Sequence, residues 1–157
     1  MNDIKLYLGG SLFSESNILG RKHEYKVATE ALPEATIFSP VMADFNTSKD
    51  TMLPTAKDIF EGDLKEILDT DYFIADLGDM YDTGLHGELG VVAGLNHYSM
   101  KNIVIIGVLS DIRLSSSNKY EIPPYGMNHF QLGLIESNGY IVKSFDEALE
   151  LIKKLES

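Results

Sequence analysis

The segment YDTGLHGELGVVAGLNHY, residues 81–98, surrounds one carboxylate, Glu88, with four glycines. It begins like a turn and continues as an apolar helical pattern. If the helix begins at about residues 83–84, Glu88 lies near its first turn, where unpaired amides and the helix dipole favour an ionised carboxylate. Gly87 and Gly90 remove side chains that would keep a ligand away. We therefore interpret Glu88 as an ionised, accessible nucleophile on a rigid helix.

A second carboxylate, Asp82, lies six residues before Glu88 in the predicted loop. We expect it to face the same pocket and to keep its proton through like-charge repulsion or partial burial. Two carboxyl groups in opposite protonation states suit chemistry at the anomeric carbon of a sugar, since one attacks the carbon and the other protonates the leaving group.

Two further candidates lie in the predicted first strand and in the loop that follows it. The loop LGGSLF, residues 8–13, matches neither the G-x-G-x-x-G pattern nor the Walker A lysine motif. It is therefore either a phosphate-binding loop or a tight turn that opens a helix. Tyr7 lies in the middle of the strand, where an aromatic residue commonly belongs to the core.

The helix predicted before the third strand carries several carboxylates. Asp63 follows Gly62 inside this helix, where a glycine costs about 1 kcal/mol relative to alanine. Close approach of a ligand or of another backbone is one explanation for that glycine, and Asp63 is otherwise an ordinary solvated side chain. We expect Asp58 and Glu66 to be solvated. His86 either lines the pocket or, as we expect, lies exposed in a loop.

Strand and helix patterns alternate along the whole chain. Strands are predicted at 4–9, 35–40, 72–77, 102–108 and 139–144, and helices at 15–32, 55–69, 84–98, 126–137 and 146–156. Such alternation implies right-handed crossovers and a parallel sheet covered on both faces. We predict a three-layer, doubly wound α/β domain of flavodoxin-like or Rossmann-like type with about five strands. Its ligand should bind beyond the carboxyl ends of the strands.

The composition restricts the classes of function. A chain of 157 residues with 44% hydrophobic residues fits one domain, spanning residues 1–157. A net charge of -11 opposes binding to nucleic acid or to anionic membranes. The chain has no cysteine, and its four histidines lack the spacing of metal ligands, so we expect no metal. The N-terminus begins as a strand rather than a signal peptide, and we expect a cytoplasmic protein.

Three motifs together resemble the nucleoside 2-deoxyribosyltransferase family: GLHGELG with Asp82 six positions before Glu88, LYLGGSLF at the first strand, and EGDLKEI in the helix before the third strand. The resemblance extends from residue 5 to about residue 133. It implies that Glu88 is the nucleophile, that Tyr7 orients it, and that Asp63 and Asp82 recognise and protonate the leaving base. The substrate-binding residues that we assign in these motifs are Gly9, Phe13 and Gly84.

The segment NHFQLG resembles the family segment in which a neighbouring subunit lends an asparagine to the site. That position is Asn128, and Phe130 takes the place of the apolar residue over the sugar. The resemblance thus implies a homo-oligomer with shared active sites. It also implies a double displacement on a deoxynucleoside and a free nucleobase, without a metal or another cofactor.

Two alternatives remain open at this point. Close relatives hydrolyse 2'-deoxynucleoside 5'-monophosphates and carry an arginine and a serine where this chain has Phe13 and Asp82, a difference that disfavours a phosphate. A non-catalytic nucleotide-binding module would share the same pocket. The tail SFDEALELIKKLES reads as an amphipathic helix, whereas typical transferases end in an aromatic segment that helps to build the site. The long polar connection at 110–126 is either a lid or a subunit contact.

Overall fold

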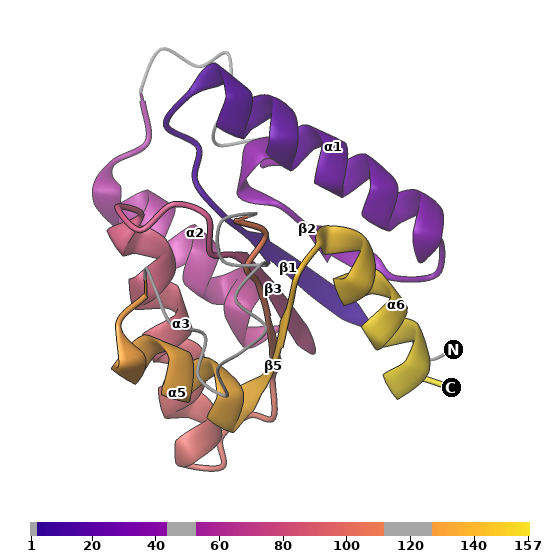
Figure 1. Ribbon diagram of the computed structural model, residues 1–157. Helices are drawn as coiled ribbons and strands as arrows, with labels where there is room; N and C mark the ends of the chain where they lie inside the picture. Colours follow the sequence, from indigo (N-terminus) through magenta and orange to yellow (C-terminus); the bar gives the residue numbers. More distant parts are fainter. Residues whose placement is uncertain (1–2, 44–52, 112–126) are drawn as a thin grey trace.

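The computed structural model describes residues 3–43, 53–111 and 127–157, which form one five-stranded, all-parallel sheet between two layers of helices (Figure 1). The strands are β1 (Lys5–Gly9), β2 (Thr36–Phe38), β3 (Tyr72–Asp76), β4 (Val104–Val108) and β5 (Gly139–Val142). The helices are α1 (Glu15–Ala31), the 3-10 turn η1 (Pro40–Met42), α2 (Ala56–Leu68), α3 (Thr83–His97), α5 (His129–Asn138) and α6 (Phe145–Leu155). The predicted three-layer α/β fold is confirmed. The connection predicted at 110–126 lies outside the described residues from 112 onward.

The alternation of side chains along the strands builds two cores. On β1, Leu6 and Leu8 face one side of the sheet and pack with α1 and α6. Tyr7 faces the other side and packs with α2, α3 and α5. Because the three central strands, β1, β3 and β4, are buried on both faces, they read as nearly continuous apolar runs in the sequence.

The helix starts follow from local capping chemistry. The N-cap residues are Ser14, Thr55, Asp82, Asn128 and Ser144, and each side chain accepts a backbone N–H of its own first turn. The helical elements that follow two of the strands explain why these strands end earlier than predicted. β5 stops at Val142 because Ser144 caps α6, and β2 stops at Phe38 because η1 begins at Pro40.

The strand order is β2-β1-β3-β4-β5, so the chain reverses its direction of travel across the sheet between β1 and β3. The carboxyl ends of these two strands flank the position at which such folds bind ligands. The C-terminus lies at the opposite end of the strands, the amino-terminal end, where the Tyr72 hydroxyl at the start of β3 donates to Glu156.

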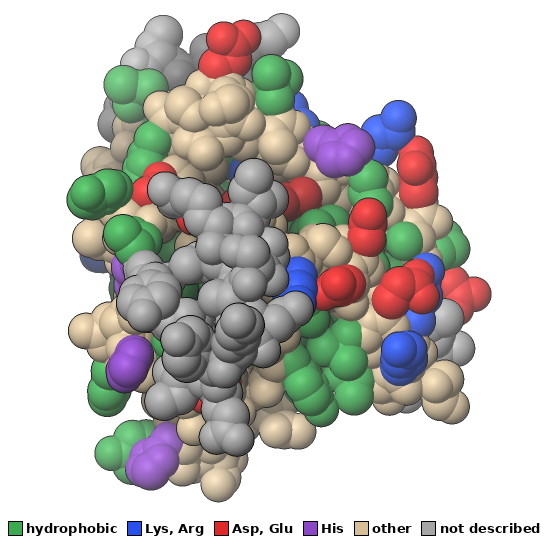
Figure 2. Space-filling model, viewed as in Figure 1, with side chains coloured by type: hydrophobic (Ala, Val, Ile, Leu, Met, Phe, Trp, Pro, Cys, Tyr) green, Lys and Arg blue, Asp and Glu red, His purple; other side chains and the backbone are tan. Residues whose placement is uncertain are grey.

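Charged side chains of both signs are interspersed over α6 and the adjoining part of α1 (Figure 2). Lys26 pairs with Glu30 there, and Lys153 pairs with Glu150. This layer therefore presents a solvated face. Within residues 3–43, 53–111 and 127–157, none of the helices has the length and apolar character needed to cross a membrane.

Candidate active site

Glu88 and Tyr7 meet above the sheet, although 81 residues separate them in sequence. The Tyr7 hydroxyl donates to Glu88 Oε1 at 3.2 Å. The Tyr7 ring is fully buried and stacks on Phe73 at a centroid distance of 4.6 Å. Tyr7 is therefore both a core aromatic residue and a fixed hydrogen-bond donor to the carboxyl group.

The environment of Glu88 corrects one sequence-based expectation. Burial, with smaller contributions from the charges of Asp63 and Asp82, raises the pKa of Glu88 to about 8 despite the opposing hydrogen bond from Tyr7. α3 begins at Thr83, so Glu88 is in its second turn and lies beyond the unpaired amides of the first. The expected ionised carboxylate is thus wrong, because the raised pKa favours neutral Glu88 at pH 7.

A pocket of about 370 Å³ opens beside Glu88, between α2 and α3. Asp63 lies in its wall, and Asp63 Oδ1 is buried without a hydrogen-bond partner among the described residues. Burial raises the pKa of Asp63 to about 6, and the charge of Glu66 adds to the rise. Glu66 is half-buried rather than fully solvated as expected, whereas Asp58 is exposed and caps α2. The lining residues are Ala56, Ile59, Phe60, Asp63, Leu64, Ile67, Thr83, Gly84, Gly87, Glu88 and Val91.

Asp82 has a different position from the one expected. It is buried at the N-cap of α3, where its Oδ1 accepts the N–H of Leu85 at 3.1 Å. It is not among the residues that line the pocket, but it is close enough for its charge to raise the pKa of Glu88. Asp82 thus fixes the start of the helix that carries Glu88.

Gly9 and Phe13, both expected to bind substrate, lie away from this pocket. A Cβ on Gly9 would approach the Phe73 ring to 2.7 Å, so this glycine is required by core packing. The Phe13 side chain is 72% exposed on the loop after β1.

Asn128 and Phe130 also lie away from Glu88 within the chain. Asn128 caps α5 by accepting the N–H of Phe130 at 2.8 Å, and the Phe130 ring is 82% exposed. Asn128 lines a second pocket of about 200 Å³ together with His86. His86 belongs to α3 and is half-buried, which corrects the expectation of an exposed loop histidine. In the described parts of the chain, no three His, Asp or Glu side chains are grouped as a metal site.

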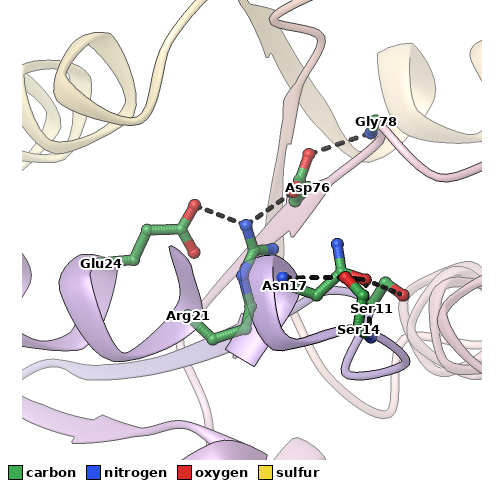
Figure 3. A network of polar contacts seen from close by, with 7 residues as sticks. All are labelled: Ser11, Ser14, Asn17, Arg21, Glu24, Asp76 and Gly78. Atoms are coloured by element: carbon green, nitrogen blue, oxygen red, sulfur yellow. Dashed lines mark hydrogen bonds and ion pairs between the residues drawn. The ribbon is translucent and has the colours of Figure 1, made fainter. Parts of the chain in front are cut away.

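Sequence reasoning missed a buried arginine, Arg21 on α1. Its signal was present, because Arg21 lies on the same stripe of α1 as Tyr25 and Ala28, which pack into the core. Arg21 pairs with Asp76 at the carboxyl end of β3 (Figure 3). The apolar wall that α2 gives to the pocket was missed as well.

One family model matches most of this chain, and several solved structures resemble its fold. The family model for nucleoside 2-deoxyribosyltransferases matches residues 6–152. No curated protein sequence matches this chain. A conserved protein from Enterococcus faecalis V583 has a similar structure, with a TM-score of 0.78 at 22% identity over 96% of this chain and 98% of that chain.

Two further solved structures share the fold. One is a 2-deoxyribosyltransferase from Bacillus psychrosaccharolyticus, with a TM-score of 0.57 at 22% identity over 92% of this chain and 90% of that chain. The other is a CMP N-glycosidase from Clostridium botulinum, with a TM-score of 0.57 at 15% identity over 95% of this chain and 98% of that chain. The extent of the family match, together with this fold, shows that the chain belongs to the nucleoside 2-deoxyribosyltransferase family.

Proposed function

We propose that this protein is a nucleoside 2-deoxyribosyltransferase, which exchanges the base of a 2'-deoxynucleoside through a covalent deoxyribosyl intermediate on Glu88. The supporting observation is the hydrogen bond from the buried Tyr7 to Glu88, whose side chain lines a pocket together with Asp63. Tyr7 fixes one carboxyl oxygen, while Gly84 and Gly87 leave the approach to Glu88 clear of side chains. A fixed carboxylate with an open approach suits attack on C1'.

The reaction has two steps. In the first, a Glu88 oxygen bonds to C1' while the bond from C1' to the base nitrogen breaks, and its electron pair leaves with the base. The departing base takes a proton. In the second step, another base attacks C1', and the bond between C1' and the Glu88 oxygen breaks with its electron pair returning to the carboxylate. The incoming base releases a proton to the group that protonated the first base. Two inversions at C1' give net retention.

Asp63 is the better placed of the two aspartates to be this acid. It lines the pocket with a buried oxygen that has no hydrogen-bond partner among the described residues, and burial raises its pKa to about 6. One oxygen of Asp82 is already engaged by the N–H of Leu85. We assign proton transfer to Asp63, and to Asp82 the placement of α3.

The site favours a neutral nucleoside over a nucleotide. Three carboxyl groups, those of Asp63, Asp82 and Glu88, lie in or beside the pocket. They disfavour a 5'-phosphate at close range. Hydrolysis of a deoxynucleoside monophosphate remains the second candidate, because a CMP N-glycosidase shares the fold.

One experiment separates the candidates. The protein is incubated with thymidine and free adenine, and the products are separated by chromatography. Deoxyadenosine is the expected product of the transferase. Free thymine without deoxyadenosine would instead indicate a hydrolase, with deoxynucleoside monophosphates as the next substrates to test. No turnover of nucleosides or monophosphates would contradict the enzymatic proposal and favour a binding module.

The working unit is proposed to be a homo-oligomer. Asn128 and Phe130 lie outside the Glu88 pocket of their own chain, and Phe130 is 82% exposed. In a symmetric dimer, each chain can give these residues to the site of its partner.

A further inference from the structure

Arg21 lies in a place where an arginine is unfavourable to bury. Its side chain is only 8% exposed, and its Nε and Nη1 atoms are buried without hydrogen-bond partners among the described residues. Nη2 alone contacts both carboxylates, Glu24 Oε1 at 2.8 Å and Asp76 Oδ2 at 2.6 Å (Figure 3). An arginine desolvated to this degree lowers stability unless its ion pairs compensate. We therefore consider a role for Arg21 beyond stability.

The two ion pairs have different structural consequences. Glu24 is on the same helix as Arg21, so this pair links α1 only to itself. Asp76 is the last residue of β3, and its second oxygen, Oδ1, accepts the N–H of Gly78 at 2.9 Å. The Asp76 carboxylate thus connects Arg21 to the loop that leads to α3.

Arg21 also contacts the loop after β1. A Cβ on Gly10 would collide with Arg21 Nη1, so the backbone of this loop lies directly against the guanidinium group. Only glycine permits so close an approach. Arg21 therefore lies directly against the first loop and is connected to the second loop through Asp76, at the position where the strand order reverses.

These two loops determine where the reacting groups lie. The first follows the strand that carries Tyr7, and the second leads through Asp82 to the helix that carries Glu88. Arg21 itself does not line the pocket. Any effect that it has on a reaction must therefore act through the loops.

We propose that Arg21, acting through Asp76, is a positioning residue that fixes the loop before α3 relative to β1 and so sets the geometry between Tyr7 and Glu88. The proposal rests on the proposed base-exchange function for its kinetic consequence. Its structural part, the fixing of residues 77–82, can be measured without any activity.

The test compares two carboxylate variants matched in chemistry. Asp76→Asn keeps an oxygen for the Gly78 N–H but loses the charge that holds Arg21. We expect kcat to fall about 10- to 100-fold, with KM little changed. Glu24→Gln removes the other charge without affecting the loop, and kcat should stay within a few fold. Burial raises the pKa of Glu24 to about 7, so at neutral pH the native protein already populates the neutral form that Gln imitates.

Chemical rescue gives a second readout that loss of stability would not produce. Arg21→Ala leaves a space shaped for a guanidinium ion below Gly10, and added guanidinium at a non-denaturing concentration should restore part of kcat. Sodium chloride at the same ionic strength should not. Equal losses in Asp76→Asn and Glu24→Gln, or no loss in either, would overturn the proposal. A folded Arg21→Ala that guanidinium does not rescue would also overturn it, and if Arg21→Ala fails to fold, the carboxylate pair decides.

Amide hydrogen exchange separates this proposal from the proposed function. Residues 77–82 should exchange faster in Asp76→Asn than in wild type, with α6 unchanged. If the wild type turns over no nucleoside or nucleotide, the proposed function fails, and this measurement alone decides whether Arg21 fixes the loop. Unchanged exchange at 77–82 would overturn it.

Discussion

Glu88, Asp63 and Tyr7 form a group of three neighbouring acids whose pKa values are all raised. Burial raises the pKa of each of them, and Glu88 and Asp63 raise that of Tyr7 further. Tyr7 therefore remains a hydrogen-bond donor, and its bond to Glu88 favours the ionised form of that carboxylate. The proposed mechanism would use the fraction of molecules in which Glu88 is charged and Asp63 holds a proton.

The first prediction concerns stability at the residue scale. The pKa of Glu88 is about 8 in the folded protein against an ordinary value of 4.5. A raised pKa favours folding when the group is protonated, so this contribution is present below about pH 4.5 and is lost as pH rises through about 8. Glu88→Gln stays neutral, and at about pH 9 it should be more stable than wild type by about 1–3 kcal/mol.

Urea unfolding at about pH 5 and about pH 9 checks this prediction, because the two proteins should differ little at the lower pH. Glu24 and Asp63 also have raised pKa values, so some loss of stability with pH should persist in the variant. Identical pH dependence in both proteins would contradict the assigned pKa of Glu88.

The second prediction concerns the charge next to the nucleophile. Asp63→Asn removes a negative charge that raises the pKa of Glu88, so that pKa should fall. The measurement is kcat/KM against pH, using a deoxyriboside whose leaving group needs no proton. In wild type, kcat/KM should rise with pH with a midpoint near pH 8, and in the variant the midpoint of this rise should lie at lower pH. An unchanged midpoint would mean that the Asp63 charge does not reach Glu88.

Part of this site, namely Glu88 with Tyr7, Asp63 and Gly84, could be predicted from sequence, but the protonation states could not. The glycines around Glu88 mark an accessible carboxylate before any fold is known. Whether that carboxylate is charged depends on burial and on Asp63, which α2 supplies from a separate part of the chain. The same holds for Arg21, because its partner Asp76 lies 55 residues away.

At the scale of elements, α3 combines anchoring and access in one helix. Leu85, Leu89 and Val92 are buried against the sheet, while Glu88 and Gly87 face the pocket. At three glycines in the helix, Gly87, Gly90 and Gly94, an added Cβ would meet no atom of another element within 4 Å. Core packing therefore does not require them, although each lowers helix stability.

The third prediction tests what Gly87 is for. Gly87→Ala should raise the free energy of unfolding by about 1 kcal/mol, because alanine favours a helix, but should lower kcat/KM because the new methyl group narrows the pocket. Gly90→Ala is the matched control, since Gly90 does not line the pocket. It should gain similar stability without losing activity. Thermal melts measure the stability of both variants, and base-exchange rates measure their activity. Full activity of Gly87→Ala would contradict a role for Gly87 in keeping the pocket open.

Strand and helix periodicity predicted the order of the elements correctly, and capping determined where they end. Thr55 and Asp58 form a capping box that starts α2, and Ser14 and Asn17 form one that starts α1. The predicted start of α1 matches the observed one, whereas that of α2 is one residue early and that of α5 is three residues early. Periodicity does not show which side chain satisfies the free amides, and that choice sets the boundary.

At the scale of the whole molecule, the fourth prediction concerns shared sites. If a partner chain completes each site, Glu88→Ala and Asn128→Ala are each inactive alone. Mixing them under subunit exchange should restore part of the activity, because some sites then combine an intact Glu88 with an intact Asn128. The Asn128→Ala change also removes the cap of α5, so an Asn128→Asp variant, which keeps a capping oxygen, serves as the control.

Light scattering at the assay concentration completes this test. A fully active monomer would rule out sharing, and Asn128 would then act only as the cap of α5.

The last residues of the chain lie at the amino-terminal end of the strands, away from Glu88, and the contact between Tyr72 and Glu156 holds them there. β1 also begins at that end of the sheet, where Lys5 pairs with Thr36 of β2. A linker attached at either end would therefore leave from the side of the molecule remote from the pocket mouth. The protein could be coupled to a solid support or fused to another enzyme through its termini, and its pocket would still face the solution.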